Sequence, residues 1–400
     1  MTKPTQAVIL AGGRGERLRP LTDTVPKPMI AFHGTPFLDY LLELLREQGI
    51  ERVVLLLGYL PEAIRSYCGD GSRWGLSIDY AVSPVEDDTG RRLQQAASKL
   101  DPIFLLMYCD NYWPLQLDRL WRQFSAAEAS AAFVVYRNDD RHTRDNVAVD
   151  ADGFVTRYDK DRTAAGLRGV EIGFAICRRE ALALLPDGNP SFEREVYPRL
   201  AAQRKLRALV TDHRYYSVSS PERLPATEQF LARRPAIILD RDGVLNRKPA
   251  RAEYVRSWAD WQWLPGALEA LRRLKDAGWR VVIVSNQAGI ARGVMTEAQL
   301  DAVHAQLRQD VRQAGGEIDA IYHCPHGWDE GCACRKPAPG LLFQAQRQLA
   351  LDLSRTYFIG DDERDGRAAE AAGCPWKLVS DQVTLLDVVR EVLEEAYVAR

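Results

Sequence analysis

Long apolar runs are missing from this sequence of 400 residues, and so is an excess of charge of either sign. No stretch approaches the roughly 18 consecutive apolar residues of a membrane-spanning helix, so we expect no membrane span. The first residues, MTKPTQAVILAGG, lack the charged start and cleavage site of a secretory signal peptide, which favours a cytoplasmic protein. Lys and Arg total 53 against 55 Asp and Glu, a formal charge of -2. This balance excludes a protein-wide basic field for nucleic acid or anionic membranes, so phosphate recognition must be local and small phosphorylated partners are favoured.

Cysteine is scarce, and its number is odd. Seven cysteines in a reducing compartment are poor material for a disulfide framework. Three of them share a short segment with one histidine, in the order Cys324, His326, Cys332 and Cys334. Three thiolates and one imidazole form a closed tetrahedral set for Zn²⁺ with no position left for water. We therefore predict a structural zinc ion that fixes the loop presenting Arg335 and Lys336. The other cysteines are interpreted as ordinary buried thiols: Cys68, Cys109, Cys177 and Cys374.

Short-period repeats and low-complexity tracts are absent as well. Instead, two segments each have the pattern that begins an α/β domain. AVILAGGRGERL at 7–18 and AIILDRDGVLN at 236–246 are each an apolar strand followed by a polar loop with glycine, a common start of a parallel α/β domain. FLARRPA at 230–236 indicates a helix end and a proline break. We predict two doubly wound α/β domains, a Rossmann-like one at 1–232 and another at 236–400. The expected strands are 6–10, 53–57 and 103–108, then 236–239, 281–284 and 356–359.

Acidic and polar residues follow the expected strands of the second half in a distinctive order. Asp240 and Asp242 come first, then Ser285 and Asn286, then Lys336, and last Asp361 and Asp365. An aspartate nucleophile needs a second acid to protonate the leaving oxygen and a hard cation to offset its repulsion with a phosphate. The ordered set therefore favours phosphotransfer over solvated acidic loops.

This set resembles the haloacid dehalogenase superfamily over roughly residues 236–385. The resemblance implies that Asp240 becomes an aspartyl-phosphate, that Asp242 is the general acid and then base, and that Ser285 and Lys336 bind the phosphate. It also implies that Asp240, the carbonyl of Asp242 and Asp361 hold Mg²⁺. Asp365 would orient this loop, and Asp362 is interpreted as a solvated turn residue.

The segments DRDGVLN, SNQAGIARG and CRKPAPG, with the zinc loop, resemble one branch of that superfamily. The branch contains D-glycero-D-manno-heptose 1,7-bisphosphate phosphatases and histidinol-phosphate phosphatases, and the ligand spacing does not choose between them. Asn286 and Arg335 are expected to contact the substrate. Arg292 either binds the distal part of a phosphosugar or is a plain surface arginine.

The first half contains LAGGRGERLRPLTDTVPKPMI at 10–30, in which a glycine-rich turn precedes two cations. Glycines let backbone N–H groups approach phosphate oxygens, and two cations can brace a triphosphate and the attacking phosphate. The stretch resembles the signature of sugar-1-phosphate nucleotidylyltransferases, with similarity through about residue 230. The resemblance implies that Gly12, Gly13 and Gly15 cradle the nucleotide, that Arg17 and Lys27 stabilise charge, and that Asp110 binds Mg²⁺.

Several positions depart from that family's pattern. Ser217 stands where the family has a second metal-binding Asp, and a hydroxyl is a poorer ligand for Mg²⁺ than a carboxylate. DDTGRRL at 87–93 replaces a glycine-rich base-binding segment. Lys160 occupies the position of the sugar-phosphate lysine, and Glu171 is either a sugar-binding residue or a solvated edge residue. The first half is therefore either a working nucleotidyltransferase or a regulatory module that binds nucleotide or sugar without turnover.

The two halves together favour one bifunctional enzyme of nucleotide-sugar biosynthesis. The second half would remove the 7-phosphate of D-glycero-D-manno-heptose 1,7-bisphosphate, and the first would convert heptose 1-phosphate to an NDP-heptose, with GTP favoured by the resemblance. The alternatives are an active phosphatase with an impaired regulatory first half, or a histidinol-phosphate-type phosphatase. No motif decides the base, the anomer or the oligomeric state.

Overall fold

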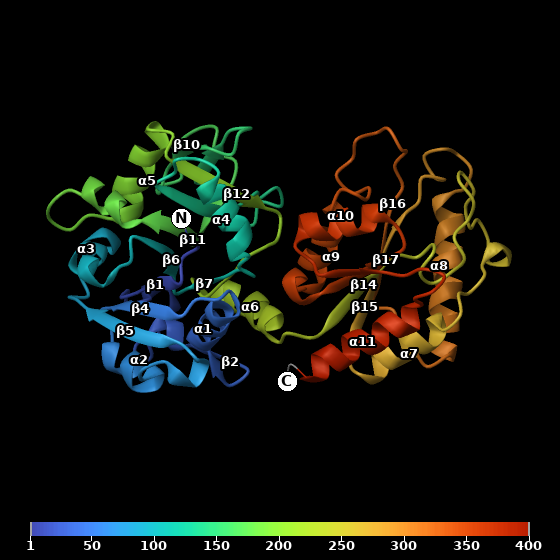
Figure 1. The fold of residues 1–400 in the computed structure, drawn as a ribbon, viewed down its shortest axis with the longest axis horizontal. Helices are drawn as coiled ribbons and strands as arrows, with labels where there is room; N and C mark the ends of the chain where they lie inside the picture. The colour runs from blue at the N-terminus through green and yellow to red at the C-terminus, as the bar shows by residue number, and fades with distance from the viewer. Residues whose placement is uncertain (1, 399–400) are drawn as a thin grey trace. The chain divides into compact units, whose positions relative to one another are not determined.

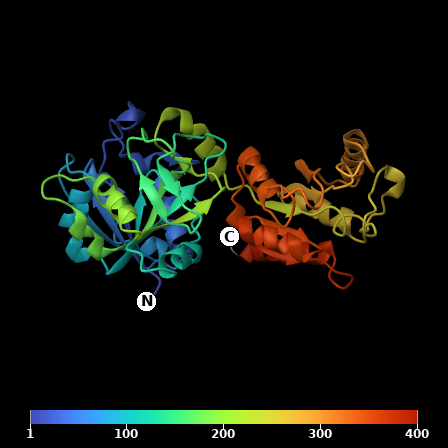
Figure 2. The same ribbon diagram turned by 90° about the horizontal axis from the view of Figure 1, so that it is seen from above.

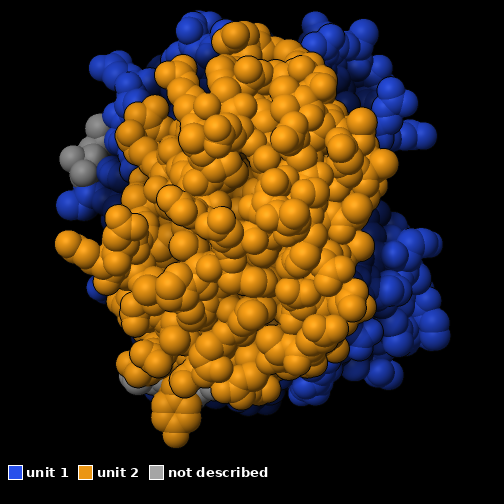
Figure 3. All heavy atoms as spheres, turned by 90° about the vertical axis from the view of Figure 1, so that its right-hand side faces the viewer, with its two compact units in different colours: residues 1–231 blue, residues 232–400 orange. Residues whose placement is uncertain are grey.

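The structure is a computed structural model that describes residues 2–398. The chain folds into two compact units, residues 1–231 (unit 1) and 232–400 (unit 2), which Figure 3 shows in different colours. Each unit has its own sheet and is described by itself. No helix within residues 2–398 is both long and apolar enough to cross a membrane.

Unit 1 is an α/β domain around a seven-stranded sheet. The strands of this sheet are β1 (Gln6–Ala11), β4 (Arg52–Leu57), β5 (Ser77–Val82), β6 (Ile103–Tyr108), β8 (Ala131–Tyr136), β11 (Val170–Arg178) and β12 (Leu206–Thr211). Its α-helices are α1 (Phe37–Glu47), α2 (Pro61–Cys68), α3 (Thr89–Gln95), α4 (Leu117–Ser125), α5 (Phe192–Ala202) and α6 (Leu224–Leu231). Short strand pairs are β2 (Ala31–Phe32) with β3 (Thr35–Pro36), β7 (Asn111–Tyr112) with β13 (Tyr216–Ser217), and β9 (Val147–Val149) with β10 (Val155–Tyr158). Short 3-10 helices are η1 (Glu16–Leu18), η2 (Lys27–Met29), η3 (Ser72–Trp74), η4 (Ala97–Lys99), η5 (Arg179–Leu184) and η6 (Pro221–Arg223).

The sheet of unit 1 has the strand order β12-β8-β11-β6-β1-β4-β5 (Figure 1). β1 is parallel to β4 and β6, whereas β11 is antiparallel to both β6 and β8. Val8 and Leu10 of β1 join a core with residues of α3 and α5, and Ala7 and Ile9 are buried on the opposite face. A strand buried on both faces reads as a continuous apolar run, which is why the sequence predicted β1. The antiparallel β11 was not predicted.

Unit 2 has a five-stranded sheet in which every pair is parallel. Its strands are β14 (Ala236–Leu239), β15 (Arg280–Asn286), β16 (Ala320–Cys324), β17 (Tyr357–Gly360) and β18 (Trp376–Leu378). Its α-helices are α7 (Ala267–Asp276), α8 (Glu297–Gln313), α9 (Gly340–Leu349), α10 (Glu363–Ala372) and α11 (Leu385–Val398), and its 3-10 helices are η7 (Trp258–Asp260) and η8 (Leu353–Arg355).

The strand order β16-β15-β14-β17-β18 places β14 at the centre of this sheet. Ile237 and Leu239 face a core that includes α7, α8 and α11, whereas Ile238 faces a second core that includes α9 and α10. Figure 1 shows α9 and α10 on one side of this sheet and α7 and α11 on the other, and Figure 2 gives the same ribbon from above. Because the chain passes to β15 on one side of β14 and to β17 on the other, a crevice forms at the carboxyl end of β14. The predicted fold class, two α/β domains with parallel strands, is confirmed.

Candidate active sites

The carboxyl ends of the strands in unit 2 surround a cavity of about 750 Å³. Asp240 directly follows β14, Ser285 lies near the end of β15, and Asp361 follows β17. Lys336 reaches the same cavity from the segment before α9. The parallel sheet thus gathers residues from four distant stretches of the sequence at one edge.

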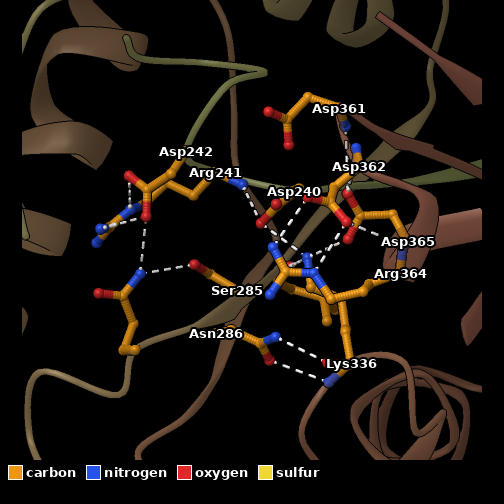
Figure 4. A network of polar contacts seen from close by, with 12 residues as sticks. Asp240, Arg241, Asp242, Ser285, Asn286, Lys336, Asp361, Asp362, Arg364 and Asp365 are labelled. Carbon is orange, nitrogen blue, oxygen red and sulfur yellow. Dashed lines mark hydrogen bonds and ion pairs between the residues drawn. The ribbon is translucent and has the colours of Figure 1, made fainter. Parts of the chain in front are cut away.

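Lys336 lies at the centre of this group (Figure 4). Its Nζ is 2.8 Å from Asp240 Oδ1 and 2.7 Å from Asp365 Oδ1. It also donates to the carbonyl of Val284 at 3.0 Å. Burial alone would lower the pKa of Lys336, but the two carboxylates raise it. Lys336 is therefore a buried permanent cation beside Asp240.

One carboxylate oxygen from each of Asp240, Asp361 and Asp365 lies within 4.8 Å of the other two. Oδ1 of Asp361 is buried without a hydrogen-bond partner, and its Oδ2 accepts a hydrogen bond from Lys248 Nζ at 2.7 Å. Oδ2 of Asp365 instead accepts the backbone N–H groups that follow β17, from Asp361 and Asp362, each at 3.2 Å. The buried Oδ1 of Asp361, close to two other carboxylates, suits Mg²⁺, which prefers oxygen ligands. Asp365 orients the loop through its hydrogen bonds to the backbone.

Asp242 points away from Asp240 (Figure 4). Three side chains hold its carboxylate. Arg241 donates to both of its oxygens, at 3.1 and 2.9 Å, Asn246 donates at 2.9 Å, and Gln287 donates at 3.0 Å. Burial would raise the pKa of Asp242, but Arg241 and these donors lower it. The geometry keeps Asp242 ionised here. Arg241 and Gln287 were not predicted as site residues, although Arg241 lies inside the Asp-x-Asp pair.

Ser285 and Asn286 differ in what their side chains do. Ser285 Oγ lines the cavity and accepts a hydrogen bond from Gln287 at 2.7 Å. The Asn286 side chain lines it too, but it bonds the backbone N–H of Lys336 at 3.0 Å and the carbonyl at 3.1 Å. Asn286 thereby fixes the backbone that carries Lys336.

The far wall of the cavity is formed by Arg251, Tyr254, Trp328 and Arg335. Arg292 lies behind this wall: its guanidinium is 4.7 Å from the Trp328 ring centroid and donates to Tyr254 Oη at 3.2 Å. Arg335 donates to the carbonyl of His326 at 3.4 Å. Sequence reasoning singled out Arg292 and Arg335 but missed Trp328, which lies inside the cysteine-rich loop.

The four donor atoms of the cysteine-rich loop converge. Cys324 Sγ lies 3.5 Å from His326 Nδ1, 3.6 Å from Cys332 Sγ and 3.3 Å from Cys334 Sγ. His326 Nδ1 is 3.1 Å from Cys334 Sγ. Four N and S donors at these separations fit one tetrahedral Zn²⁺. His323, outside the set, lies 3.0 Å from Glu297 instead.

In unit 1, three clefts meet at the loop after β1. One of about 360 Å³ is lined by Arg14, Gly15, Arg17 and Lys27. A second of about 250 Å³ includes Gly12, Gly13, Arg92 and Asp110. A third of about 580 Å³ includes Arg17, Asp110, Lys160, Glu171 and Ser217. The sequence-predicted residues of this half therefore share one continuous region, with Arg17, Lys27 and Asp110 at the junction.

Lys27 Nζ and Asp110 Oδ2 form a half-buried ion pair at 2.7 Å. Burial would raise the pKa of Asp110, but the ammonium group of Lys27 lowers it below its usual value. Ser217 is buried, and its backbone N–H donates to Thr227 Oγ1 at 3.1 Å. β13 pairs Ser217 with Asn111, the residue after Asp110. The position next to Asp110 is thus occupied by a short hydroxyl side chain.

Arg92 explains part of the altered segment at 87–93. Its guanidinium is buried and donates to the carbonyl of Leu57 at 2.9 Å, to Ser83 Oγ at 2.6 Å and to the carbonyl of Pro84 at 3.0 Å. A Cβ at Gly12 would lie 2.3 Å from Arg92 Cζ, so a larger residue there would displace the guanidinium. Arg92 ties the glycine-rich loop to the neighbouring segments.

Lys160 is anchored by Glu193, a residue that the sequence did not single out. Glu193 is fully buried and lies 3.0 Å from Lys160 Nζ. It also accepts hydrogen bonds from Thr89 at 2.7 Å and from Tyr108. Burial would raise the pKa of Glu193, but Lys160 and these donors lower it to about 2. Burial raises the pKa of Glu171, on the cleft wall, to about 7.

Comparison with known protein families separates the two halves. The nucleotidyl transferase family matches residues 6–158. The haloacid dehalogenase-like hydrolase family matches residues 145–373, more than half of the chain. The chain belongs to the haloacid dehalogenase-like hydrolases. The hydrolase match begins inside unit 1, but the strand that carries Asp240 belongs to unit 2. Unit 1 carries the nucleotidyl transferase domain.

Individual relatives of this hydrolase resemble one half each. D-glycero-beta-D-manno-heptose-1,7-bisphosphate 7-phosphatase of Bordetella bronchiseptica is 48% identical over 141 residues, 35% of this chain and 78% of that protein. The Pseudomonas aeruginosa protein of the same name is 46% identical over 146 residues, 36% of this chain and 81% of that protein. The crystal structure of HddC from Yersinia pseudotuberculosis covers 56% of this chain and 99% of that one, with a TM-score of 0.50 and 24% identity, and shows a shared fold.

Proposed function

We propose that the chain is a bifunctional enzyme of nucleotide-sugar biosynthesis. Unit 2 hydrolyses the 7-phosphate of D-glycero-D-manno-heptose 1,7-bisphosphate, and unit 1 joins the resulting heptose 1-phosphate to a nucleoside monophosphate, with GTP the favoured donor. The observation that carries the proposal is the buried group of Asp240, Lys336 and Asp365 at the carboxyl end of β14. The identity of 48% to a protein named for this phosphatase activity supports the substrate.

In unit 2, Asp240 is proposed to attack the 7-phosphorus, forming an aspartyl-phosphate that water then hydrolyses. Lys336 and Ser285 would hold the phosphate oxygens beside Asp240. Asp242, ionised in this structure, would take up a proton from solvent once its hydrogen bonds to Arg241 rearrange. It would then pass this proton to the leaving oxygen and later accept one from the attacking water. Bound Mg²⁺, held by Asp240, Asp361 and the carbonyl of Asp242, would offset the repulsion between the nucleophile and the phosphate.

The distal part of the substrate would lie against the far wall. Arg335 and Arg251 line the cavity there and offer charge to the retained 1-phosphate. Arg292 would act through Trp328 and Tyr254, which it contacts, rather than on the sugar directly. Zn²⁺ held by Cys324, His326, Cys332 and Cys334 would fix the loop that carries Trp328 and leads to Arg335.

In unit 1, the glycine-rich loop and the clefts at Arg17 and Lys27 would hold the triphosphate. An oxygen of the sugar 1-phosphate would attack the α-phosphorus near Asp110, with Lys160 close by, and the bond from the α-phosphorus to the bridging oxygen would break to release pyrophosphate. Mg²⁺ would rest on Asp110, substrate phosphates and water, because Ser217 supplies no carboxylate. The lack of a carboxylate at Ser217 favours one alternative for unit 1, a regulatory module that binds the same ligands without turnover.

The test is ³¹P NMR of the full chain with Mg²⁺, inorganic pyrophosphatase, each anomer of heptose 1,7-bisphosphate in a separate tube, and each nucleoside triphosphate in turn. The expected result is loss of the 7-phosphate signal and growth of a nucleotide-sugar diphosphate with one base. Accumulation of heptose 1-phosphate with every triphosphate would leave the phosphatase assignment and reject the transferase one. An unchanged spectrum in every tube would reject the heptose substrate.

A further inference from the structure

The sugar-side cleft of unit 1, about 580 Å³, has more cationic than anionic side chains on its wall. The cations are Arg17, Arg144, Lys160, Arg162 and Arg223. Among the described residues that line the cleft, the carboxylates are Asp110 and Glu171. Asp110 already pairs with Lys27. The cleft therefore offers more positive charge than one sugar phosphate requires.

Three of these cations, Arg144, Arg162 and Arg223, are called the arginine cluster here. Arg144 belongs to the segment 142–144, and Arg162 and Arg223 contact this segment. Arg162 donates to Thr143 Oγ1 at 3.2 Å and to the carbonyl of Arg144. Arg223 Nη1 lies 3.3 Å from His142 Nε2 and donates to Tyr215 Oη at 3.3 Å. These contacts use one terminal nitrogen of each guanidinium. Further N–H groups of both side chains are left for a ligand in the cleft.

No carboxylate within the described residues forms an ion pair with the arginine cluster. Nearby acids have other partners: Asp140 pairs with Arg214, and Asp161 pairs with Arg194 at 2.6 Å. The lowered pKa of the neighbouring His142 is consistent with this surplus of positive charge. Burial first, and then Arg223 and Arg214, lower its pKa to about 4, so it stays neutral near pH 7.

The arginine cluster is separate from the groups at the reaction junction. Arg17 lines both the sugar-side cleft and the smaller cleft with Lys27. Lys160 lies over the Tyr108 ring at 5.9 Å and pairs with Glu193. These two cations are placed for the 1-phosphate. The arginine cluster remains for an anion elsewhere on the same sugar, and planar guanidinium groups suit phosphate oxygens.

We propose that the arginine cluster is a second anion subsite, through which unit 1 binds a sugar bisphosphate more tightly than the corresponding 1-phosphate. The inference rests on the proposed function, because the bisphosphate handled by unit 2 supplies the second phosphate. A sugar 1-phosphate that carries a carboxylate shares this chemistry. Unit 1 would then hold the phosphorylated sugar before its distal phosphate is removed.

The experiment is calorimetric titration of the full chain carrying Asp240→Asn, which keeps the bisphosphate from being consumed. With heptose 1,7-bisphosphate, we expect unit 1 of this chain to bind about tenfold more tightly than unit 1 of a chain that also carries Arg162→Gln and Arg223→Gln. Heptose 1-phosphate should bind unit 1 about tenfold more weakly than the bisphosphate, the effect of one charge-assisted contact. The control is Arg168→Gln, which removes one guanidinium charge from an exposed position outside the cleft.

Equal affinity of unit 1 for the bisphosphate with and without the arginine substitutions would overturn the subsite. If the double variant fails to fold, Arg144→Gln replaces it, because Arg144 is exposed and its loss should still weaken binding of the bisphosphate at least threefold. If glucuronic acid 1-phosphate binds more tightly than the bisphosphate, the arginine cluster is a site for a carboxylate, and the proposal that it binds a second phosphate is wrong. A chain that releases neither phosphate nor pyrophosphate would reject the proposed function, while the titration would still decide the subsite.

Discussion

Lys336 shows how one buried side chain can combine structural and chemical roles. Its ammonium group neutralises Asp240 and Asp365, two carboxylates that burial would otherwise make costly. The same group faces the cavity in which a phosphate would sit. A substitution at this position should therefore affect folding and catalysis by separable routes.

We expect Lys336→Met to lower the free energy of unfolding of unit 2 by roughly 3–5 kcal/mol, because it leaves two buried carboxylates without a cation. Adding Asp365→Asn should recover part of the stability but none of the phosphate release. Urea unfolding and a phosphate assay check both effects, with exposed Lys275→Met as the matched control. Equal activity in the double variant and the parent would show that Lys336 does not act on the phosphate.

Glu171 gives unit 1 a dependence on pH near neutrality. Because burial raises its pKa to about 7, the cleft gains negative charge as the pH rises through 7. We expect the KM for the sugar phosphate in nucleotidyl transfer to rise about threefold more between pH 6 and 8 in the parent than in Glu171→Gln. Parallel KM profiles in the two proteins would contradict this role.

The raised pKa of Glu171 also makes the stability of the folded chain depend on pH. The folded chain keeps a proton on Glu171 between about pH 4.5 and 7, where the unfolded chain has released it. Stability should therefore fall as the pH rises through this window, and Glu171→Gln should remove that part of the slope. Unfolding measured at several pH values tests the direction without any substrate.

At the scale of elements, the loop between β16 and α9 connects the cluster of three cysteines and His326 to the cavity that Lys336 lines. Cys324 ends β16, and the other three donors lie in the loop that leads to Arg335 and Lys336. The loop has little regular structure, so a bound metal would supply its rigidity. Asn286, from the neighbouring strand β15, fixes the other end of the loop through the backbone of Lys336.

We expect the full chain to hold one zinc ion, and Cys332→Ser to reduce the zinc content strongly. Loss of the metal should lower the melting temperature of unit 2 and reduce kcat/KM for phosphate release about tenfold or more, because Trp328 and Arg335 lose their fixed positions. Metal analysis, calorimetry and the phosphate assay provide the readouts. The control is Cys374→Ala, a buried thiol of unit 2 outside the cluster. Unchanged zinc content in Cys332→Ser would contradict the ligand set.

At the scale of the molecule, each unit contains all the residues proposed for its own reaction. Asp240, Ser285, Lys336 and Asp361 belong to unit 2, and Arg17, Lys27, Asp110 and Lys160 belong to unit 1. Neither proposed chemistry needs a group from the other unit. The two activities should therefore be separable by single substitutions in the intact chain.

We expect Asp240→Asn to abolish phosphate release from the bisphosphate while pyrophosphate release with heptose 1-phosphate continues. Asp110→Asn should give the reverse pattern, with pyrophosphate release reduced at least a hundredfold, since it removes the proposed metal ligand near the α-phosphate. Glu222→Gln, an exposed carboxylate of unit 1, is the control for Asp110. Loss of both activities in either variant would show that the units depend on each other.

The amino-acid sequence by itself determined the two α/β halves and the order of the polar residues that follow the strands. Buried parallel strands read as apolar runs because both of their faces lie in a core, so β1, β14 and β17 were visible as patterns. The cysteine-rich loop was visible as well, since its ligands are close together along the chain. The comparisons confirm the family that these motifs suggested.

Only the tertiary structure decided which side chains meet. Glu193 contacts Lys160, and Arg162 and Arg223 contact the segment at 142–144, across separations in sequence that no local pattern encodes. Arg92 looked like a lost binding motif, yet it is a buried brace for the glycine-rich loop. Burial and charge pairing depend on packing between distant elements. For that reason the pKa of Glu171, the state of Asp242 and the surplus charge of the sugar-side cleft emerged only from the folded chain.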